Sequence, residues 1–302
     1  MLPFSRVTII GLGLIGSSIA RAVRETMPTV RLTAHDADPQ VRATVRALDL
    51  ADDVADTAGA SVTDADLVIL CVPVGAMAAV AAEIAADLPA DAVVSDVGSC
   101  KEEVARALTA AIPPAQVVPA HPVAGTERSG PEAGFASLFH GRWCIVTPLA
   151  ESDPTAAERV AEFWRRLGSQ VETMAPDHHD RVLAVTSHLP HLIAYTIVGT
   201  ASDLEEVTSS EVIKFSAGGF RDFTRIAASD PTMWRDVFLS NKEAVLEMLQ
   251  RFSEDLSQLQ RAIRWGDGDA LFDAFTKTRA IRRSIVDQGQ DDAAADFGRR
   301  HG

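Results

Sequence analysis

The sequence has few cysteines, few cations and no apolar run that stands out as a membrane span. Three of its 302 residues are cysteines and none forms a CxxC pair, which argues against a disulfide framework or a structural zinc site. Lys and Arg number 28 against 42 Asp and Glu, and the net charge of −14 disfavours binding to nucleic acid or anionic lipid. The longest apolar run, residues 67–82, contains Pro73 and Gly75 and is shorter than the ~20 residues that a spanning helix needs. We therefore expect a cytoplasmic protein without a metal, nucleic-acid or membrane partner.

Short apolar runs alternate with amphipathic, Ala-rich stretches over the first part of the chain. Continuous rather than alternating hydrophobicity is typical of strands covered on both faces, as in a parallel sheet. The strand–helix–strand rhythm predicts a doubly wound α/β fold. We expect a Rossmann-type dinucleotide-binding domain over residues 1–175. The predicted strands are residues 7–10, 30–34, 67–72, 92–95, 117–119, 143–147 and 171–174.

Helical periodicity replaces the strand pattern after residue 175. Residues 178–203 predict a helix that Pro190 should kink, and a last helix is expected over residues 269–287. Asp230-Pro231 opens a helix that could run to Trp265, or ~50 Å at 1.5 Å per residue. A compact domain of ~120 residues cannot bury such a helix alone. We therefore expect an all-α dimerisation domain over residues 176–302, in which a second copy covers an apolar seam. The seam consists of Val245, Leu249, Phe252, Leu256, Leu259 and Ile263.

The sequence GLGLIG at residues 11–16 follows a predicted strand and precedes a predicted helix. In such a loop Gly11 allows the tight turn, Gly13 lets the backbone approach a pyrophosphate, and Gly16 permits close packing of the helix. The helix N-terminus would then face the phosphates with its unpaired N–H groups. A glycine turn that binds no ligand is the alternative.

Asp36 lies 20 residues beyond Gly16, at the end of the second predicted strand. A carboxylate there would accept hydrogen bonds from the ribose hydroxyls and repel a 2′-phosphate, which favours NAD over NADP. Similar loops after the next strand often border the cofactor. The expected cofactor-binding residues are Gly11, Leu12, Gly13, Leu14, Ile15, Gly16, Asp36, Val72 and Pro73.

Four stretches carry the side chains suited to catalysis. Three of them are DVGSCK at residues 96–101, HPVAGTERSG at 121–130 and GGFRDFTR at 218–225, and the fourth consists of His188 and His191, upstream of the last motif. The first two follow predicted strands, where open α/β sheets bind their ligands. Histidine suits the removal of a hydroxyl proton near neutral pH, and arginine suits the binding of a carboxylate.

In these motifs the sequence resembles the prephenate dehydrogenase family, which includes arogenate and cyclohexadienyl dehydrogenases. The resemblance covers about residues 7–286 and depends on HPVAGTERSG, SHLPH and GGFRDFTRIAASDPTMWRD in this order. It implies NAD-dependent oxidative decarboxylation of prephenate to 4-hydroxyphenylpyruvate in tyrosine biosynthesis. It also implies a homodimer formed through the helical domain, with both subunits shaping each pocket. Positioning and one base would suffice for this chemistry, without a metal.

The resemblance also implies roles for particular residues. His121 would accept the proton of the ring hydroxyl, and Ser99 would hydrogen-bond both the hydroxyl and the histidine. Arg225 would bind a substrate carboxylate, and His191 would contact the pyruvyl side chain. The remaining residues expected near the substrate are Gly219, Thr126 and Glu127. From their positions in the chain, we interpret His188 as helix packing beside the kink and His178 and His179 as capping or interface groups.

Other functions compete with this one. Arogenate dehydrogenase and 4-amino-4-deoxyprephenate dehydrogenase share the motifs, although an amine substrate fits the Ser99 and His121 pair less well. A β-hydroxyacid dehydrogenase would carry a GxxxKxxxN motif, whereas here Lys214 is followed by Gly218 where the Asn would be. A non-catalytic NAD sensor would have no evident use for an intact base, serine and arginine.

Overall fold

The computed structural model describes residues 2–126, 128–208 and 218–287. By its internal contacts the chain divides into two compact units, Met1–Val245 and Leu246–Gly302. The boundary that we predicted between residues 175 and 176 stays a prediction. All the side chains discussed below as a candidate site belong to the first unit.

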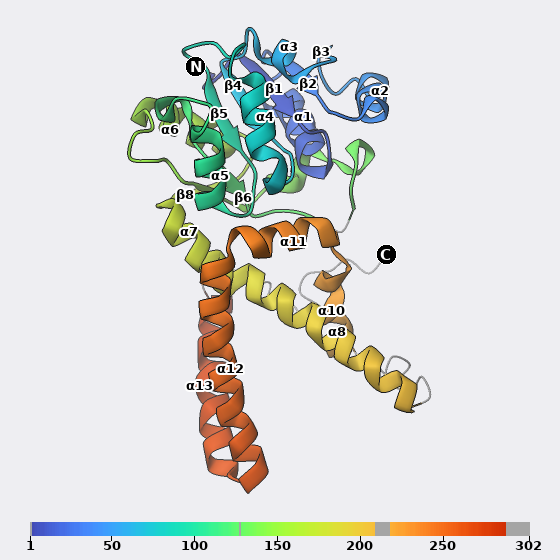
Figure 1. The fold of residues 1–302 in the computed structure, drawn as a ribbon, viewed down its shortest axis with the longest axis vertical. Coiled ribbons are helices and arrows are strands. Elements are labelled where there is room, and N and C mark those ends of the chain that lie inside the picture. The colour runs from blue at the N-terminus through green and yellow to red at the C-terminus, as the bar shows by residue number, and fades with distance from the viewer. Residues whose placement is uncertain (1, 127, 209–217, 288–302) are drawn as a thin grey trace. The chain divides into compact units, whose positions relative to one another are not determined.

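The N-terminal part contains a five-stranded parallel sheet with the strand order β3-β2-β1-β4-β5 (Figure 1). The strands are β1 (Arg6–Ile10), β2 (Arg31–His35), β3 (Asp53–Val54), β4 (Leu67–Leu70) and β5 (Val93–Asp96). The helices of this region are α1 (Leu14–Thr26), α2 (Pro39–Ala47), α3 (Ala58–Val62), α4 (Met77–Ile84) and α5 (Lys101–Thr109). The predicted doubly wound fold is confirmed. The sequence pattern missed β3, because two residues are too few to form an apolar run.

A second sheet of three strands follows, formed by β6 (Ala120–Pro122), β7 (Trp143–Val146) and β8 (Gln170–Thr173). It is mixed rather than parallel, since β6 and β7 are antiparallel. The strand predicted at residues 117–119 begins three residues later, and Val117 forms only an isolated bridge to Val94 of β5. The strand predicted at residues 171–174 was expected to be covered on both faces, whereas β8 is mostly exposed.

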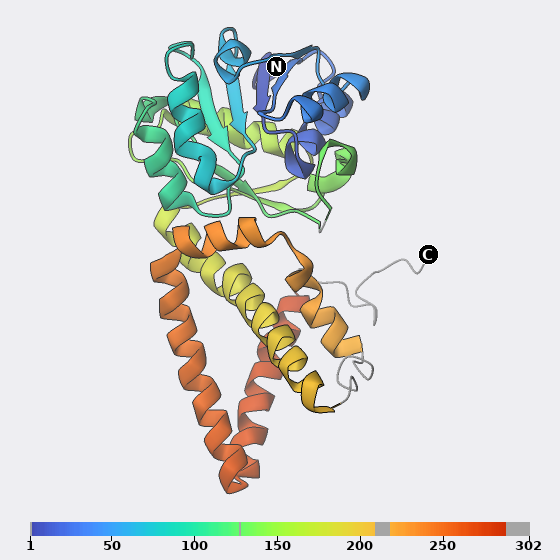
Figure 2. The same ribbon diagram turned by 45° about the vertical axis from the view of Figure 1, so that its right-hand side comes forward.

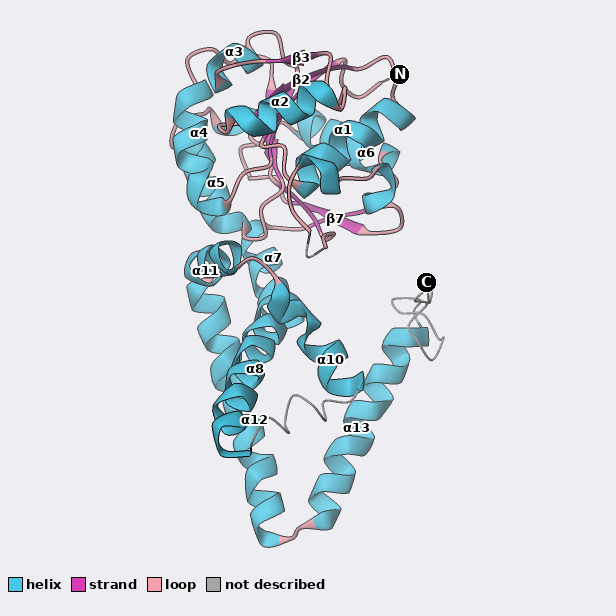
Figure 3. Cartoon of the chain, turned by 90° about the vertical axis from the view of Figure 1, so that its right-hand side faces the viewer, coloured by secondary structure: helices cyan, strands magenta, loops and turns pink. Residues whose placement is uncertain are grey.

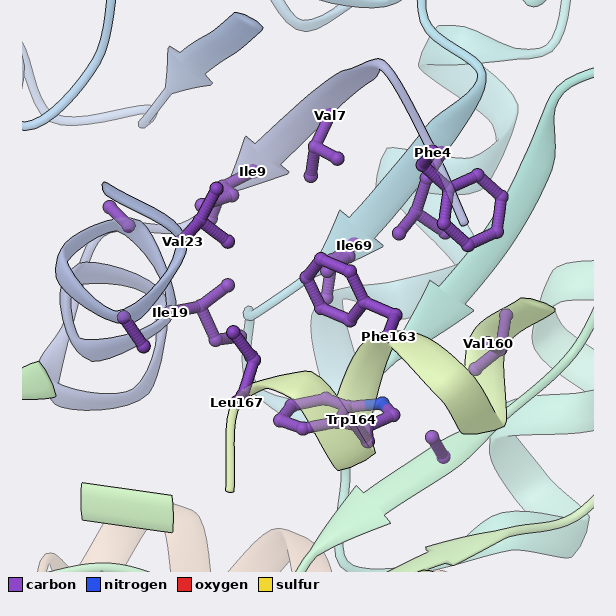
Figure 4. Close-up of a cluster of buried hydrophobic side chains, with 14 of the residues drawn as sticks. Phe4, Val7, Ile9, Ile19, Val23, Ile69, Val160, Phe163, Trp164 and Leu167 are labelled. Carbon is purple, nitrogen blue, oxygen red and sulfur yellow. The ribbon is translucent and has the colours of Figure 1, made fainter. Parts of the chain in front are cut away.

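Alternate residues of β1 point to opposite faces of the parallel sheet, and both faces are covered. Val7 and Ile9 contribute to one buried cluster, and Ile10 contributes to the other. The first cluster also contains Phe163 and Trp164 of α6 (Pro154–Arg166), whose rings meet edge to face with centroids 5.8 Å apart (Figure 4). This packing explains why the strand sequences are apolar throughout.

From residue 176 onward the described residues form helices only (Figure 3). They are α7 (Pro176–Leu183), α8 (Leu189–Thr208), α10 (Gly218–Thr224), α11 (Pro231–Ser240), α12 (Lys242–Trp265) and α13 (Gly268–Asp287). A π-helical turn at Ala184–His188 joins α7 to α8. It lies directly before the predicted interruption at Pro190, whose ring nitrogen cannot donate a helical hydrogen bond. Helix α10 lies beside α8 (Figure 2).

Short 3₁₀ turns complete the described structure. They are η1 (Val74–Ala76), η2 (Pro114–Gln116), η3 (Pro131–Ala133), η4 (Ala136–Phe139) and η6 (Arg225–Ala228). The loop that follows β6 reaches α1, where the main-chain N–H of Phe135 donates to the hydroxyl of Ser18 over 3.1 Å.

The prediction of a single helix from Pro231 to Trp265 is wrong, because the helix is interrupted at Asn241, between α11 and α12. Asn241 is buried, and its side chain donates to the main-chain oxygen of Asp180 over 2.8 Å. Helix α12 has 24 residues, which makes it about 36 Å long rather than ~50 Å. Of the predicted seam only Val245 is buried within the chain, and Ile263 is 67% exposed.

Residues 176–203 are long and apolar enough to cross a membrane when only length and composition are considered. One such helix is weak evidence, because the core helix of a soluble protein passes the same test. The stretch also carries a buried Asp180, whose polar contacts are described below. Because polar residues interrupt its apolar positions, the sequence predicted a helix here but no membrane span.

Candidate active site

The glycine loop has the shape that a dinucleotide requires. Gly11 has φ of +96°, and a Cβ there would lie 2.5 Å from the main-chain oxygen of Cys71. A Cβ at Gly16 would lie 2.0 Å from the oxygen of Gly11, so helix and loop can approach only without side chains. Around Gly13 a Cβ would meet no atom within 4 Å. Gly13 is also the N-cap of α1 and provides no side-chain cap, which leaves the helix N–H groups available to phosphates.

The other residues predicted to bind the cofactor border this loop. Leu12 and Leu14 are buried and Ile15 packs against the core, so their main chain alone can face a ligand. Val72 and Pro73 follow β4 and are half-buried and exposed, respectively.

The carboxylate of Asp36 contacts the glycine loop directly. Its Oδ2 accepts a 2.8 Å hydrogen bond from the main-chain N–H of Leu12, and its Oδ1 accepts one of 3.0 Å from Asp38. A carboxylate oxygen has lone pairs for a further donor, so Asp36 can also accept from ribose hydroxyls. The residues therefore fit an adenine dinucleotide, and Asp36 stabilises the loop in addition to its predicted role.

The segment that carries Ser99 is tied to the strand that carries His121 by a buried ion pair. Lys101 is fully buried and pairs with Asp96, and its ammonium also donates to the oxygen of Ala120 over 2.8 Å. Asp96 in turn accepts a 3.2 Å hydrogen bond from the N–H of Ala120. These contacts fix the end of β5 against the start of β6. Between the described residues no hydrogen bond joins the hydroxyl of Ser99 to His121, and the predicted contact stays a prediction.

His121 is buried in the middle of β6 and belongs to a chain of three side chains. Its Nδ1 lies 2.9 Å from Nε2 of His179, and Nδ1 of His179 lies 2.7 Å from Oδ1 of Asp180. Asp180 also accepts hydrogen bonds from the main-chain N–H groups of Lys101 and Glu102, at 2.7 and 3.0 Å. It thereby caps the N-terminus of α5. Because it connects His121 with Asp180, His179 is more than the capping or interface group that we predicted.

Burial sets the protonation of these histidines. It is the main cause that lowers the pKa of His121 well below its usual value, and the nearby His179, Lys101 and His188 act in the same direction. Burial also lowers the pKa of His179 and outweighs the hydrogen bond to Asp180, which raises it. His121 and His179 are therefore neutral near pH 7, as a proton acceptor must be.

His188 is held by Asn241 from the helix break. The side-chain amide nitrogen of Asn241 donates to the main-chain oxygen of Asp180. The same nitrogen lies 3.1 Å from Nδ1 of His188 and donates to it as well. Nδ1 of His188 is thus an acceptor and Nε2 carries the proton. Among the described residues Nε1 of Trp234 has no hydrogen-bond partner, although it is buried. Such donors are rarely left unpaired unless a ligand or water completes them.

His191 and Arg225 lie on the helical side of the site. The ring of His191 stacks on Trp234 with centroids 3.7 Å apart, and its Nδ1 donates to the oxygen of Ser187 over 2.8 Å. Burial lowers the pKa of His191, and the positive charge of Arg225 lowers it further. Arg225 begins η6 and lies close enough to His191 for its charge to act on that ring. Its side chain is exposed and can therefore contact a ligand.

The other residues predicted to contact the substrate are exposed or lie outside the described residues. Thr126 is exposed in the loop after β6, where its hydroxyl accepts from the N–H of Arg128. Gly219 is exposed in α10, and no described atom lies within 4 Å of its Cβ position. Glu127 and Lys214 lie outside the described residues. No group of three or more metal-ligating side chains occurs in the described ranges.

Comparisons with known proteins agree with this geometry. The profile of the nucleotide-binding domain of prephenate dehydrogenase matches residues 19–173, and that of its dimerization domain matches residues 175–277. The chain is 44% identical to a cyclohexadienyl dehydrogenase of Zymomonas mobilis over 94% of this chain and 97% of that one. It is 32% identical to a prephenate dehydrogenase of Bacillus subtilis, over 92% and 76% of the two chains.

A solved structure shows the same similarity. The crystal structure of prephenate dehydrogenase from A. aeolicus, in complex with hydroxyphenyl propionate and NAD+, superposes with a TM-score of 0.87 at 34% identity. The superposition covers 93% of this chain and 98% of the other. Fold, motifs and profiles together define a dehydrogenase with a nucleotide-binding domain. The chain belongs to the prephenate dehydrogenase family.

Proposed function

We propose that the protein oxidises and decarboxylates prephenate to 4-hydroxyphenylpyruvate, with NAD as the cofactor. The observation that carries this proposal is His121, which is buried, neutral and fixed beside the Ser99 segment in a chain of this family. The complex of the A. aeolicus relative with NAD+ supports the choice of cofactor, as does the contact of Asp36 with the glycine loop.

In the proposed reaction His121 removes the proton of the ring hydroxyl as that carbon becomes a carbonyl. When bound, NAD supplies the acceptor for the hydride that leaves the same carbon. The carbonyl is conjugated through the ring to the carbon that bears the carboxylate, so it accepts the electron pair released when CO2 departs. The resulting phenolate takes back a proton, which returns His121 to its neutral form.

The substrate residues act by positioning. Arg225 would bind the side-chain carboxylate, and His191 would lie against the group next to it. The unpaired N–H group of Trp234 offers a further donor to an anionic substrate. These local positive and polar groups would attract a dianion despite the net charge of −14.

Arogenate is a second candidate substrate, and the tautomer of His191 favours it. Because Nδ1 of His191 donates to Ser187, a neutral ring presents a lone pair at Nε2. That lone pair can accept from the ammonium group of arogenate, whereas the keto oxygen of prephenate offers no proton. The 44% identity to a cyclohexadienyl dehydrogenase is consistent with activity on both substrates.

Reduction of NAD or NADP in the presence of prephenate, arogenate or 4-amino-4-deoxyprephenate, measured as formation of NADH or NADPH, tests the proposal. We expect turnover of prephenate with NAD, together with turnover of arogenate. Oxidation of the amino analogue alone, or equal use of NADP, would contradict the proposal.

We also propose that the protein is a cytoplasmic homodimer that pairs through its helical domain. The match to the dimerization-domain profile and the exposed apolar residues of α12 support the pairing. The three free cysteines are consistent with a reducing compartment. Light scattering should give twice the mass of the chain at micromolar concentration, and the mass of a single chain would contradict the pairing.

A further inference from the structure

The chain from His121 through His179 to Asp180 joins two segments, β6 and α7, that are far apart in the sequence. His121 is the central residue of β6, whereas His179 and Asp180 lie in α7, and the intermediate His179 is completely buried. The two hydrogen bonds measure 2.9 and 2.7 Å, and the two imidazole planes are inclined by 65°. Neighbouring His178 is exposed and takes no part in the chain.

The charge of Asp180 fixes the direction of both hydrogen bonds. Burial raises the pKa of this carboxyl, but the hydrogen bonds from His179 and the N-terminus of α5 together hold it below its usual value. An ionised carboxylate only accepts, so Nδ1 of His179 must carry a proton. Neutral His179 then has a lone pair at Nε2, and His121 must donate to it from Nδ1. The lone pair of neutral His121 is consequently at Nε2.

We propose that His179 and Asp180 are positioning residues for the base, and that they make Nε2 of His121 the atom that takes the substrate's proton. This inference rests on the proposed function, because it needs His121 to be the base. His179 would hold the imidazole in one tautomer and one orientation throughout the reaction. The positive charge that forms on His121 would then lie two hydrogen bonds from the carboxylate of Asp180.

Asp180 would also link the position of the base to the position of the loop that carries Ser99. Its carboxylate accepts hydrogen bonds from the main chain of Lys101 and Glu102, which begin two residues after Ser99. The side chain of Lys101 reaches back to the oxygen of Ala120, next to His121. One carboxylate therefore fixes the ring of the base, through His179, and the loop that presents Ser99.

The tautomer can be read by NMR in the free enzyme labelled with ¹⁵N-histidine, using long-range correlations between ring nitrogens and ring protons. At neutral pH we expect His121 to show a protonated Nδ1 and an unprotonated Nε2, with His121→Asn used for assignment. A proton on Nε2 of His121 would overturn the inference. This measurement needs no substrate, so it stands apart from the proposed function. The latter fails if the unmodified enzyme oxidises none of the ring substrates.

Kinetics of three variants provide the second test. His179→Leu removes the acceptor, and we expect kcat to fall by roughly 10- to 1000-fold with KM changed less than about threefold, since a wrong tautomer affects only the chemical step. His179→Gln retains an acceptor near the position of Nε2 and should recover about tenfold or more of the loss. His178→Leu, at the exposed neighbour, should match the unmodified enzyme.

Thermal unfolding and quenching of tryptophan fluorescence by NADH establish that each variant is folded. If His179→Leu fails to fold, the positioning role is still tested by the NMR measurement and by the comparison of His179→Gln with the unmodified enzyme. Equal kcat in His179→Leu and the unmodified enzyme would contradict the positioning role, as would equal losses in the Leu and Gln variants.

Discussion

The imidazole of His191 lies flat on the indole of Trp234, with ring centroids 3.7 Å apart and 25° between the planes. This stacking and the hydrogen bond to Ser187 leave Nε2 as the one ring nitrogen of His191 that can meet a substrate. Whether Nε2 accepts or donates depends on protonation, and burial together with Arg225 lowers the pKa of this ring.

The first prediction concerns substrate preference and pH. As the pH falls from 8 toward 5.5, protonated His191 gains a donor for the keto group of prephenate and loses its acceptor for the ammonium group of arogenate. The ratio of kcat/KM for prephenate to that for arogenate should therefore rise. Measuring this ratio cancels the titration of His121, which both substrates share. His191→Gln should abolish the pH dependence, and a ratio that changes equally in both enzymes would contradict this role of His191.

The second prediction separates two neighbouring arginines. Arg225→Ala should raise the KM for prephenate by about 10- to 100-fold with little change in kcat, because hydrogen bonds to charged groups contribute about 1.5–3 kcal/mol. Arg221→Ala, one helical turn earlier, is the matched control and should alter KM less. Steady-state kinetics that show the larger effect at Arg221 would assign the carboxylate to that residue instead.

The third prediction concerns the cofactor. Asp36→Asn keeps one oxygen for the N–H of Leu12 but removes the charge that opposes a 2′-phosphate. We expect KM for NAD to rise by about tenfold, the effect of losing a hydrogen bond or two, while use of NADP improves. Asp36→Ser also removes the contact with Leu12, so it should weaken both dinucleotides and lower the melting temperature. Unchanged discrimination in Asp36→Asn would refute the role of this charge.

The fourth prediction concerns stability in acid. Burial lowers the pKa of His188 to about 4, against 6.5 in the unfolded chain. Above pH 6.5 His188 is neutral in the folded and in the unfolded state. Between pH 6.5 and about 4 only the unfolded state takes up the proton, so the free energy of unfolding falls as the pH falls. The loss between pH 6.5 and about 4 should reach about 3 kcal/mol from this group, at about 1.4 kcal/mol for each pH unit. His121 and His179 contribute in the same direction.

Urea unfolding at pH 7 and pH 4.5 measures this loss. His188→Asn offers Asn241 an acceptor but does not titrate, so its stability should depend less on pH. The same loss in both proteins would show that other groups cause it.

The sequence predicted the parallel sheet well because its strands are buried on both faces and therefore apolar throughout. The same rule failed for β8, which is mostly exposed, and it could not find the two residues of β3. The break at Asn241 was missed because its cause is not local. Asn241 is held by hydrogen bonds to Asp180 and His188, which lie 61 and 53 residues earlier in the chain.

The motifs predicted roles for His121, Ser99, His191 and Arg225, but not for the side chains that contact them. The sequence indicated only a capping or interface role for His179, since its partner His121 lies 58 residues away. Lys101 was quoted within its motif, yet a lysine is normally expected in solvent rather than fully buried beside an aspartate. A His-Asp pair at the start of a helix is the local signal that could have indicated the role of His179.

The turnover of His121→Asn tests the central claim most directly, that His121 is the base of the reaction. Asparagine keeps part of the hydrogen bonding but cannot take a proton, so kcat for prephenate should fall by roughly 10²–10⁴-fold with little change in KM. In the unmodified enzyme the acid limb of kcat/KM, which reports the free enzyme, should lie below the usual histidine value of 6.5, because the pKa of His121 is lowered. That limb should disappear from the residual activity of the variant. A His121→Asn enzyme with unmodified kcat and the same acid limb would contradict the assignment.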